Sequence, residues 1–389
     1  MDFRIAQAND TSAVKELWAY SFESYEPYYS WYFDNIYQPD QTLCCFDGNI
    51  LAASLQLAPY KMMLRGKPVT VCYIVGVITA APYRSQGVAA KLMKFAYDHL
   101  RQKGIALSIL LPASPEFYRK TSFAYIYEEH RFDIALKDLS LIAVPFGRWQ
   151  RGSIDSIDFL DLVYRQMTAG KNGYIIRTKQ NWHNYLQEHV GDGGKIALLQ
   201  SNAGQAAGYL LYTLKDKYFH INELGYFSPQ AQKSAFHFAL GHQNEAQRFS
   251  WSAPIDDCAY LQLPQQDGIS ARPFVMGRII DPIMALKSIS YPTHARGSLI
   301  LEIQDQQIAD NNLKLLIKVA DQAMCIENLE KSTPAHVTID ISALTTLLWG
   351  RLSVKQLVEQ MGSVSGFEIP LKFLSTLFPR CDNWINEHS

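Results

Sequence analysis

The chain has 389 residues, of which 48% are apolar, 12% aromatic and 19% charged, and this length predicts two or three domains rather than one. The formal net charge is −1 and the pI is near 6.8, so no global positive field favours nucleic acid or an anionic membrane surface. A membrane-spanning helix needs about 20 apolar residues in a row, and no apolar run in this chain is that long. From the charge and the apolar runs together we expect neither a nucleic-acid partner nor a membrane segment.

The N-terminus, Met1 to Ala6, lacks the basic start and the apolar stretch of a secretory signal. The six cysteines are scattered without a Cys-x-x-Cys pair, and the ten histidines show no metal-ligand spacing. We therefore expect a cytoplasmic protein with buried, reduced thiols and no metal site.

The first elements are a short strand over Phe3–Ala6 and a helix that Asp10 can cap and that runs to Phe22. Between Tyr20 and Tyr37 lies an aromatic-dense segment that also contains acidic residues. Rings and carboxylates of this kind can form an acceptor pocket for a cationic amine, or the rings can simply pack helices onto a sheet. As candidate substrate-binding residues we name Phe22, Glu23 and Glu26.

Two hairpins are predicted next. Asp47-Gly48-Asn49 separates the apolar runs 42–46 and 50–57, and Arg65-Gly66-Lys67 separates the runs 60–64 and 69–73. The second hairpin leads directly into the most informative part of the chain.

The stretch from Tyr73 to Tyr118 predicts strand, turn, helix and strand. Residues 73–79 are rich in β-branched side chains, residues 90–100 have helical composition and spacing, and residues 106–111 form a second apolar run. The segment Pro112 to Tyr118 leaves the second strand.

The start of this helix predicts a pyrophosphate site. The first backbone N–H groups of a helix have no partner within the helix, and the macrodipole adds partial positive charge there. Gly87 and the small Ala89 let a phosphate come close to these groups, and Arg84 adds positive charge. The alternative is an ordinary turn between a strand and a helix.

Beyond Tyr118, residues 123–134 alternate as a strand that would close a first domain near residue 145. The amino-acid composition changes at Trp149. Residues 146–281 then repeat the order of strands and helices of the first domain, but without an Arg-x-x-Gly-x-Ala motif. We expect a degenerate second copy that packs and binds no cofactor.

A third unit, 282–389, begins with four strands followed by helices, the first of which Ser342 would cap. Trp384 and Ile385 indicate a docked C-terminal tail.

The motif Arg84-x-x-Gly87-x-Ala89 after a strand resembles the acetyl-CoA signature of the GCN5-related N-acetyltransferases (GNATs). With Phe117-Tyr118-Arg119-Lys120 and the three-part organisation, the whole chain is similar to the enhanced intracellular survival (Eis) family. This resemblance implies an α/β (α+β) fold with tandem GNAT domains, 1–145 and 146–281, and a sterol-carrier-like α+β domain, 282–389. It also implies a homo-oligomer, typically a hexamer.

The resemblance implies transfer of acetyl from acetyl-CoA to an amine, such as an aminoglycoside, a polyamine or a lysine. The residues that match the cofactor-binding positions are Val77, Ile78, Thr79, Arg84, Ser85, Gln86, Gly87, Val88, Ala89, Ala90 and Ser114. Tyr118 matches the general acid, and the terminal carboxylate of Ser389 matches the base. Backbone N–H groups of residues 76–79 can stabilise the oxyanion in a direct transfer without an acyl-enzyme.

Two departures from the family pattern affect these assignments. The tail ends in Glu387-His388-Ser389 where a phenylalanine is common, so Glu387 and His388 are alternative bases. Thr121-Ser122-Phe123 replaces a Phe-Gly-aromatic turn after the catalytic tyrosine, which changes the turn that holds this residue. A different kind of function also stays open, a lipid or acyl-chain carrier with a non-catalytic acetyltransferase-like head.

Overall fold

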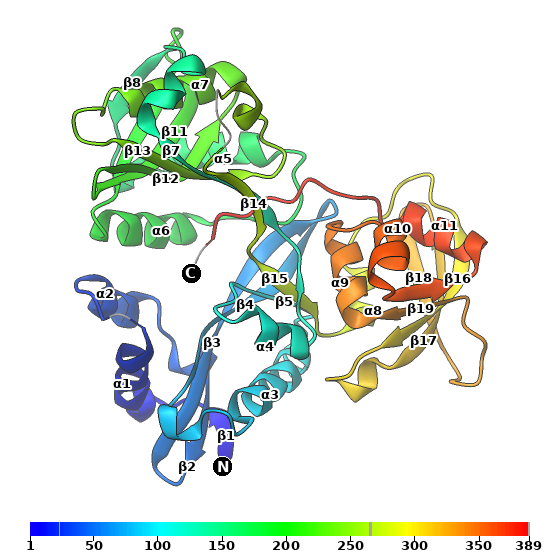
Figure 1. The fold of residues 1–389 in the computed structure, drawn as a ribbon. Coiled ribbons are helices and arrows are strands. Elements are labelled where there is room, and N and C mark those ends of the chain that lie inside the picture. The colour runs from blue at the N-terminus through cyan, green and yellow to red at the C-terminus, as the bar shows by residue number, and fades with distance from the viewer. Residues whose placement is uncertain (23, 264–266, 388–389) are drawn as a thin grey trace.

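The computed structural model describes residues 1–22, 24–263 and 267–387. It contains sheets of eight, seven and five strands, each with its own helices (Figure 1). Among the described residues, no helix combines the length and the apolar character needed to cross a membrane.

The first sheet has the order β1-β2-β3-β4-β5-β15-β6, and β9 pairs with β3. Both predicted hairpins are present, β2 with β3 and β3 with β4. The helices α1 and α2 cover one face of the sheet and α3 covers the other, so two apolar clusters flank it. The bounds are β1 Asp2–Ile5, α1 Thr11–Ser21, α2 Tyr28–Asn35, β2 Thr42–Asp47, β3 Ile50–Leu64, β4 Lys67–Thr79, α3 Val88–Gln102, β5 Leu107–Leu110, α4 Pro115–Lys120, β6 Ala124–Tyr125, β9 Tyr174–Ile175 and β15 Met276–Ile279.

The second sheet has the order β14-β7-β13-β12-β11-β10-β8. Here α5 and α6 pack on one face and α7 on the other, which repeats the arrangement of the first sheet. The bounds are β7 Glu128–Ala135, β8 Arg148–Arg151, α5 Ile157–Thr168, α6 Lys179–Gly191, β10 Lys195–Gln200, β11 Ala206–Lys215, β12 Tyr218–Tyr226, α7 Pro229–Leu240, β13 Arg248–Pro254 and β14 Ile269–Pro273.

The two sheets exchange strands, which corrects the prediction that residues 123–134 close the first domain. Within this segment, β6 belongs to the first sheet, whereas β7 belongs to the second sheet and lies between β13 and β14. In return β15, from far along the chain, pairs with both β5 and β6. A single cut in the chain therefore does not separate the two sheets.

The third sheet has the order β18-β17-β16-β19-β20. The predicted cap of the helix Ile341–Trp349 is wrong. The Asp340 carboxylate accepts from the N–H of Ala343, while the Ser342 hydroxyl donates to the carbonyl of Ser122. The bounds are α8 Pro282–Lys287, β16 Gly297–Gln304, β17 Leu313–Ala320, β18 Ala323–Leu329, β19 Val337–Asp340, α9 Ile341–Trp349, α10 Val354–Gln356, β20 Val364–Gly366 and α11 Glu368–Leu377.

Helix α9 lies between the third sheet and the first. Its leucines and Trp349 are buried, and one apolar cluster runs from the β3–β5 region through α9 to β16 and β17. This leucine-rich helix is thus part of a packed core shared by two domains, and that packing accounts for its composition without a lipid groove.

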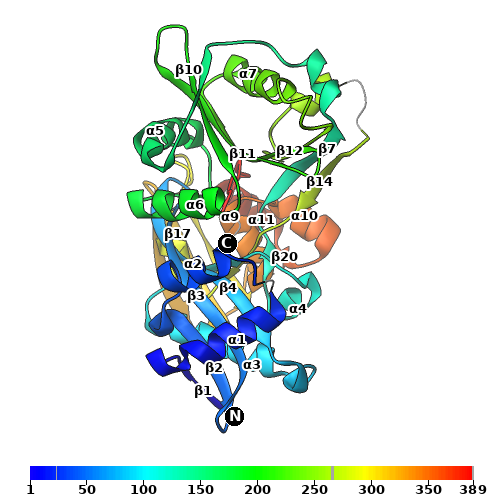
Figure 2. The same ribbon diagram turned by 90° about the vertical axis from the view of Figure 1, so that its left-hand side faces the viewer.

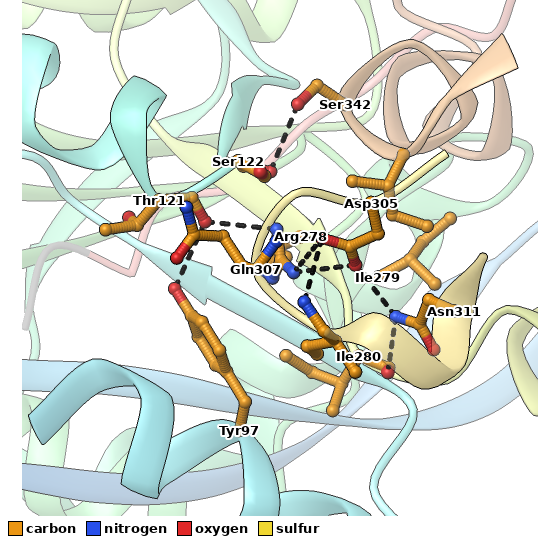
Figure 3. Close-up of polar contacts among 12 residues, drawn as sticks. Tyr97, Thr121, Ser122, Arg278, Ile279, Ile280, Asp305, Gln307, Asn311 and Ser342 are labelled. Atoms are coloured by element: carbon orange, nitrogen blue, oxygen red, sulfur yellow. Dashed lines mark hydrogen bonds and ion pairs between the residues drawn. The ribbon is translucent and has the colours of Figure 1, made fainter. Parts of the chain in front are cut away.

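A buried ion pair joins the first and third domains (Figure 3). Both side chains, Arg278 on β15 and Asp305 after β16, are fully inaccessible to solvent, and two bonds of 2.9 and 2.8 Å connect them. Arg278 also donates to the carbonyl of Thr121, and Asp305 accepts from Asn311. The pair therefore ties the third domain to the turn that follows α4.

We expect Asp305→Ala to lower the free energy of unfolding by about 3–5 kcal/mol, because the substitution leaves the Arg278 guanidinium buried without its counter-charge. Urea denaturation followed by tryptophan fluorescence measures this loss. Glu116→Ala, which removes an exposed pair with Lys120, is the control and should leave the midpoint unchanged. An equal midpoint shift in both variants would contradict the prediction.

Candidate active site

The first sheet opens into a fork between β4 and β5. These parallel strands pair only over Val71–Tyr73 with Leu107–Ile109, after which β4 continues to Thr79 and β5 ends at Leu110. The far half of β4 therefore has backbone groups on its β5 side with no strand beside them. Such a gap accepts an extended ligand arm through main-chain hydrogen bonds.

A bulge shapes the outer arm of the fork. Val75 lies opposite Gln56 and Ile78 opposite Ser54, so Gly76 and Val77 together face Leu55. Gly76 has φ of 60°, and a Cβ on it would lie 2.4 Å from the Trp18 ring. Only glycine fits there, and the bulge redirects the backbone of the residues proposed as oxyanion donors.

The signature loop ends at the start of α3, which has no side-chain cap. Gly87 occupies the N-cap position with φ of 75°, and a Cβ there would meet no atom within 4 Å. The Arg84 guanidinium donates to the carbonyl of Thr79 at 3.1 Å, which ties the loop to the end of β4. The first N–H groups of α3 thus have no side-chain cap and the space beside Gly87 is open, as a phosphate site requires. The predicted residues Ser85 and Gln86 lie on this exposed loop.

Tyr118 lies on α4 in the apolar cluster that also contains Val88 and Leu110. Burial raises the pKa of its phenol to about 12, so the hydroxyl keeps its proton at neutral pH. Ring contacts with Phe117 and Phe123 fix the side chain, with centroids 5.0 and 6.0 Å away. Its hydroxyl makes no hydrogen bond to any residue that the structure describes. Ser114, the N-cap residue of α4, is exposed.

The turn after Tyr118 keeps a left-handed residue although it lacks glycine. Ser122 has φ of 64°, and the N–H of Phe123 donates to the carbonyl of Tyr118 at 2.9 Å. The Arg278 guanidinium and the Ser342 hydroxyl hold the carbonyls of Thr121 and Ser122 (Figure 3). Contacts from β15 and the third domain thus support a conformation that glycine would adopt without strain.

The C-terminal tail docks between the first two domains. Trp384 and Ile385 are buried, as the sequence predicts, and the red tail in Figure 1 passes beneath the second sheet toward α6. The Tyr73 hydroxyl donates to the carbonyl of Glu387 at 3.3 Å. Because Tyr73 is the last β4 residue paired with β5, the tail reaches the base of the fork. Ser389 and His388 lie outside the described residues.

The Glu387 carboxylate is engaged, because it accepts from the Arg177 guanidinium at 2.7 Å. The carboxylate is thus already bound to a cation. This contact argues against the alternative in which Glu387 takes the proton from the amine.

Most rings of the aromatic segment are packing residues. Tyr32, Phe33 and Tyr37 are buried in the cluster beneath α1 and α2. Phe22 is exposed but contacts the Trp18 ring at a tilted angle, and Glu26 is exposed and accepts from Ser30. Glu23 lies outside the described residues. The structure does not bring Phe22 or Glu26 into contact with the fork.

Sequence reasoning missed two acidic residues in the last turn and at the C-cap of α6, a helix that packs against α2 (Figure 2). Glu188 and Asp192 line a groove of about 340 Å³ with His220 and Ser250, and their charges raise the pKa of Tyr28 after the larger effect of burial. Burial raises the pKa of Glu188 to about 7. No local motif marks these residues, since they meet the aromatic segment only through the fold.

We expect Glu188→Gln to stabilise the protein at pH 8 but not at pH 4. Below its ordinary pKa, Glu188 is protonated in both states. As the pH rises toward 7, Glu188 ionises in the unfolded chain but stays protonated in the folded protein. The free energy of unfolding therefore falls over this range. One pKa unit equals about 1.4 kcal/mol, and with some discount for partial exposure we expect a gain of about 2 kcal/mol. Denaturation at both pH values measures it, and Glu327→Gln on exposed β18 is the control. A gain at pH 4 would contradict this origin.

The second sheet contains an equivalent fork that is already filled. Strands β12 and β13 are parallel only over Tyr218–Ile221 with Arg248–Trp251, and then diverge. Tail residues 383–386 lie against the separated arms, where Asn386 donates to the carbonyl of Asn222 at 3.2 Å. The following helix α7 starts with Pro229, which has no N–H, and the Ser228 hydroxyl accepts from Ala231. The occupied fork and the capped start of α7 explain why we expect no phosphate site in the second domain.

Three family models match the chain in succession. An acetyltransferase (GNAT) domain model matches residues 2–126, a second one matches residues 173–279, and a sterol carrier protein domain model matches residues 283–386. The chain belongs to the GNAT acetyltransferases. It is an acyl-CoA-dependent acetyltransferase with tandem GNAT domains, and GNAT domains use acetyl-CoA as co-substrate.

The chain is similar to other N-acetyltransferases in sequence and in fold. An uncharacterised N-acetyltransferase from Streptomyces avermitilis is 20% identical over 293 residues, which cover 68% of this chain and 69% of the relative. A GCN5-related N-acetyltransferase from Anabaena variabilis has a TM-score of 0.86 at 20% identity, with 99% of each chain covered. Eis1 from Mycobacterium abscessus has a TM-score of 0.77 at 16% identity, with both chains covered completely at 100%. The two solved structures show that this GNAT acetyltransferase has an Eis-like fold.

Proposed function

We propose that this GNAT acetyltransferase moves acetyl from acetyl-CoA to a primary amine by direct attack within a ternary complex. The observation that carries the proposal is the arrival of the tail at the fork, where the carbonyl of Glu387 accepts from Tyr73. An extended chain advances about 3.5 Å per residue, so the end of the chain two residues later can reach about 7 Å from that contact.

The cofactor site that we propose combines the fork with the start of α3. The bulged end of β4 would hold the pantetheine arm and the uncapped helix start the pyrophosphate, with Arg84 adding charge. The proposed set is Val77, Ile78, Thr79, Arg84, Ser85, Gln86, Gly87, Val88, Ala89, Ala90 and Ser114.

Three groups would divide the chemistry. The terminal carboxylate of Ser389 takes a proton from the attacking amine, backbone N–H groups near Gly76 stabilise the oxyanion, and Tyr118 donates to the leaving sulfur. A cysteine route has little support, because burial raises the pKa of the Cys72 thiol to about 12 and suppresses its thiolate.

The acceptor that we propose is cationic, of the aminoglycoside, polyamine or lysine type. The proposal rests on the resemblance to the Eis family and on the Asp192 and Glu188 carboxyl groups, which line a groove on the α6 side of the tail together with Arg131 and Arg272. By resemblance to the Eis family we also infer a homo-hexamer.

Thiol release from acetyl-CoA with a panel of amines tests the function. We expect turnover with di- and polyamines, little turnover with acidic amines, and initial-velocity lines that intersect when both substrates are varied. Parallel lines would show a covalent acyl-enzyme and contradict direct transfer.

We expect Gly87→Val to raise the KM for acetyl-CoA about tenfold or more. The new side chain would occupy the open space in front of the first N–H groups of α3, where the phosphates must approach. Strain from the left-handed backbone adds about 1–2 kcal/mol of destabilisation.

Gly104→Val at the other end of α3 is the matched control. Gly104 has φ of 67°, and a Cβ there meets only the end of the Met284 side chain at 3.8 Å. This variant should be destabilised to a similar degree with an unchanged KM. Equal KM values in the two variants would remove the helix start from the cofactor site.

A further inference from the structure

The strongest buried charge cluster in the second domain lies beside the C-terminal tail. Arg177 forms two bonds of 2.8 and 2.7 Å with the Glu223 carboxylate, and both side chains are almost completely buried. A third bond runs from Arg177 to Glu387 of the tail. The guanidinium lies over three aromatic rings, with centroid distances of 4.4, 4.3 and 4.7 Å to Tyr164, Trp182 and Tyr185. This geometry leaves the guanidinium little freedom to move.

The backbone next to Arg177 belongs to the other domain. Strand β9 pairs with β3 of the first sheet, and the N–H of Ile176 donates to the carbonyl of Lys61 at 2.7 Å. Arg177 thus extends from a segment fixed to the catalytic sheet into the second domain. The Arg177 side chain therefore links the tail to the first sheet, in addition to the Tyr73–Glu387 hydrogen bond.

The tail completes the cluster with a second residue. The Asn386 amide donates to Glu223 at 2.7 Å and to the Tyr185 hydroxyl at 3.0 Å. Tyr209 also donates to Glu223. The docked tail therefore adds two charge-assisted contacts to the Arg177–Glu223 pair, one from Asn386 to Glu223 and one from Arg177 to Glu387.

We propose that Arg177 and Glu223 form a clamp that holds the tail so that the chain end lies at the reacting amine. In this inference, which rests on the proposed function, Arg177, Glu223 and Glu387 are positioning residues. The second GNAT domain then has a role in catalysis without binding cofactor, because its fork receives the tail. A base that is not held in place loses the rate advantage of proximity.

Glu387→Gln is the most direct test, because Arg177 keeps its other counter-charge, Glu223, in this variant. The Gln amide keeps the shape and loses the charge that pairs with Arg177. We expect kcat to fall about tenfold, an unchanged KM for acetyl-CoA, and about tenfold faster release of Ser389 by carboxypeptidase. Glu368→Gln in α11, an exposed ion pair with Lys372, is the matched control and should behave as wild type.

Arg177→Met is the second test. Together with Glu387→Gln and the variant that carries both substitutions, it completes a double-mutant cycle. If both residues act through one contact, the double variant loses no more kcat than Arg177→Met alone. Wild-type kcat and wild-type protection from carboxypeptidase in Glu387→Gln would overturn the clamp.

A variant that lacks residues 388–389 separates the two proposals. Loss of activity in this variant combined with wild-type behaviour of Glu387→Gln and Arg177→Met overturns the clamp and leaves the proposed function standing. Full activity in the shortened variant overturns the role of the chain end in the proposed function, and the clamp with it.

Discussion

Tyr118→Phe is expected to lower kcat by about a hundredfold while the KM for acetyl-CoA changes less than threefold. The Tyr118 side chain is buried in the same cluster as Leu110 at the end of β5, and its hydroxyl has no hydrogen-bond partner among the described residues, so we expect this hydroxyl to be available to the leaving sulfur. Its pKa of about 12 lies above the about 8.5 of a thiol, so complete proton transfer to the thiolate is uphill. The main contribution is a hydrogen bond that strengthens as charge develops, and losing one such donor costs about 10²–10³ in rate. Steady-state kinetics with both substrates varied measures the effect.

Tyr291→Phe is the matched control for this experiment. The Tyr291 hydroxyl is also buried, but it donates to the carbonyl of Leu286 at 2.6 Å within the third domain. Its loss should reduce stability by about 1 kcal/mol and leave kcat unchanged. A wild-type kcat in Tyr118→Phe would remove Tyr118 from the mechanism.

Two alanines appended after Ser389 are expected to lower kcat by at least a hundredfold without weakening acetyl-CoA binding. The extension moves the terminal carboxylate by about 7 Å, and general base catalysis contributes about 10²–10⁴ to a rate. The docked contacts of Trp384, Asn386 and Glu387 remain, so the loss would come from the displaced carboxylate alone. Isothermal titration with acetyl-CoA and kinetics with the best amine measure the two quantities.

The same two alanines placed before Met1 are the control for added length. His388→Ala tests the remaining alternative base, and we expect nearly wild-type activity from it. Unchanged kcat in the extended chain, or a hundredfold loss in His388→Ala, would contradict the role assigned to the terminal carboxylate.

The local parts of the fold were predictable because short patterns determine them. The β-branched run 73–79, the turn with Gly87 and the helix that follows are where the sequence predicts them. Two family models confirm the tandem GNAT domains and a third the sterol carrier domain. The roles of the individual site residues stay predictions.

The long-range parts could not be predicted from one sequence. The exchange of β7 and β15 depends on pairings between segments about 150 residues apart, for which no local pattern exists. Arg177 and Glu223 are single charged residues in ordinary amphipathic surroundings, and only the fold brings them to Glu387. The Ser342 cap failed for a related reason, because Asp340 competes for the same N–H groups and Ser342 has a partner in the first domain.

A crystal structure with acetyl-CoA bound tests the central claim most directly. Within the described part of the chain we identify two forks, and of these the first leads to a helix start without a side-chain cap. We predict the pyrophosphate on the N–H groups of Gly87 to Ala90 and the thioester in the gap between β4 and β5, next to Tyr118. Acetyl-CoA bound against α7 in the second domain, or at neither helix, would contradict the account.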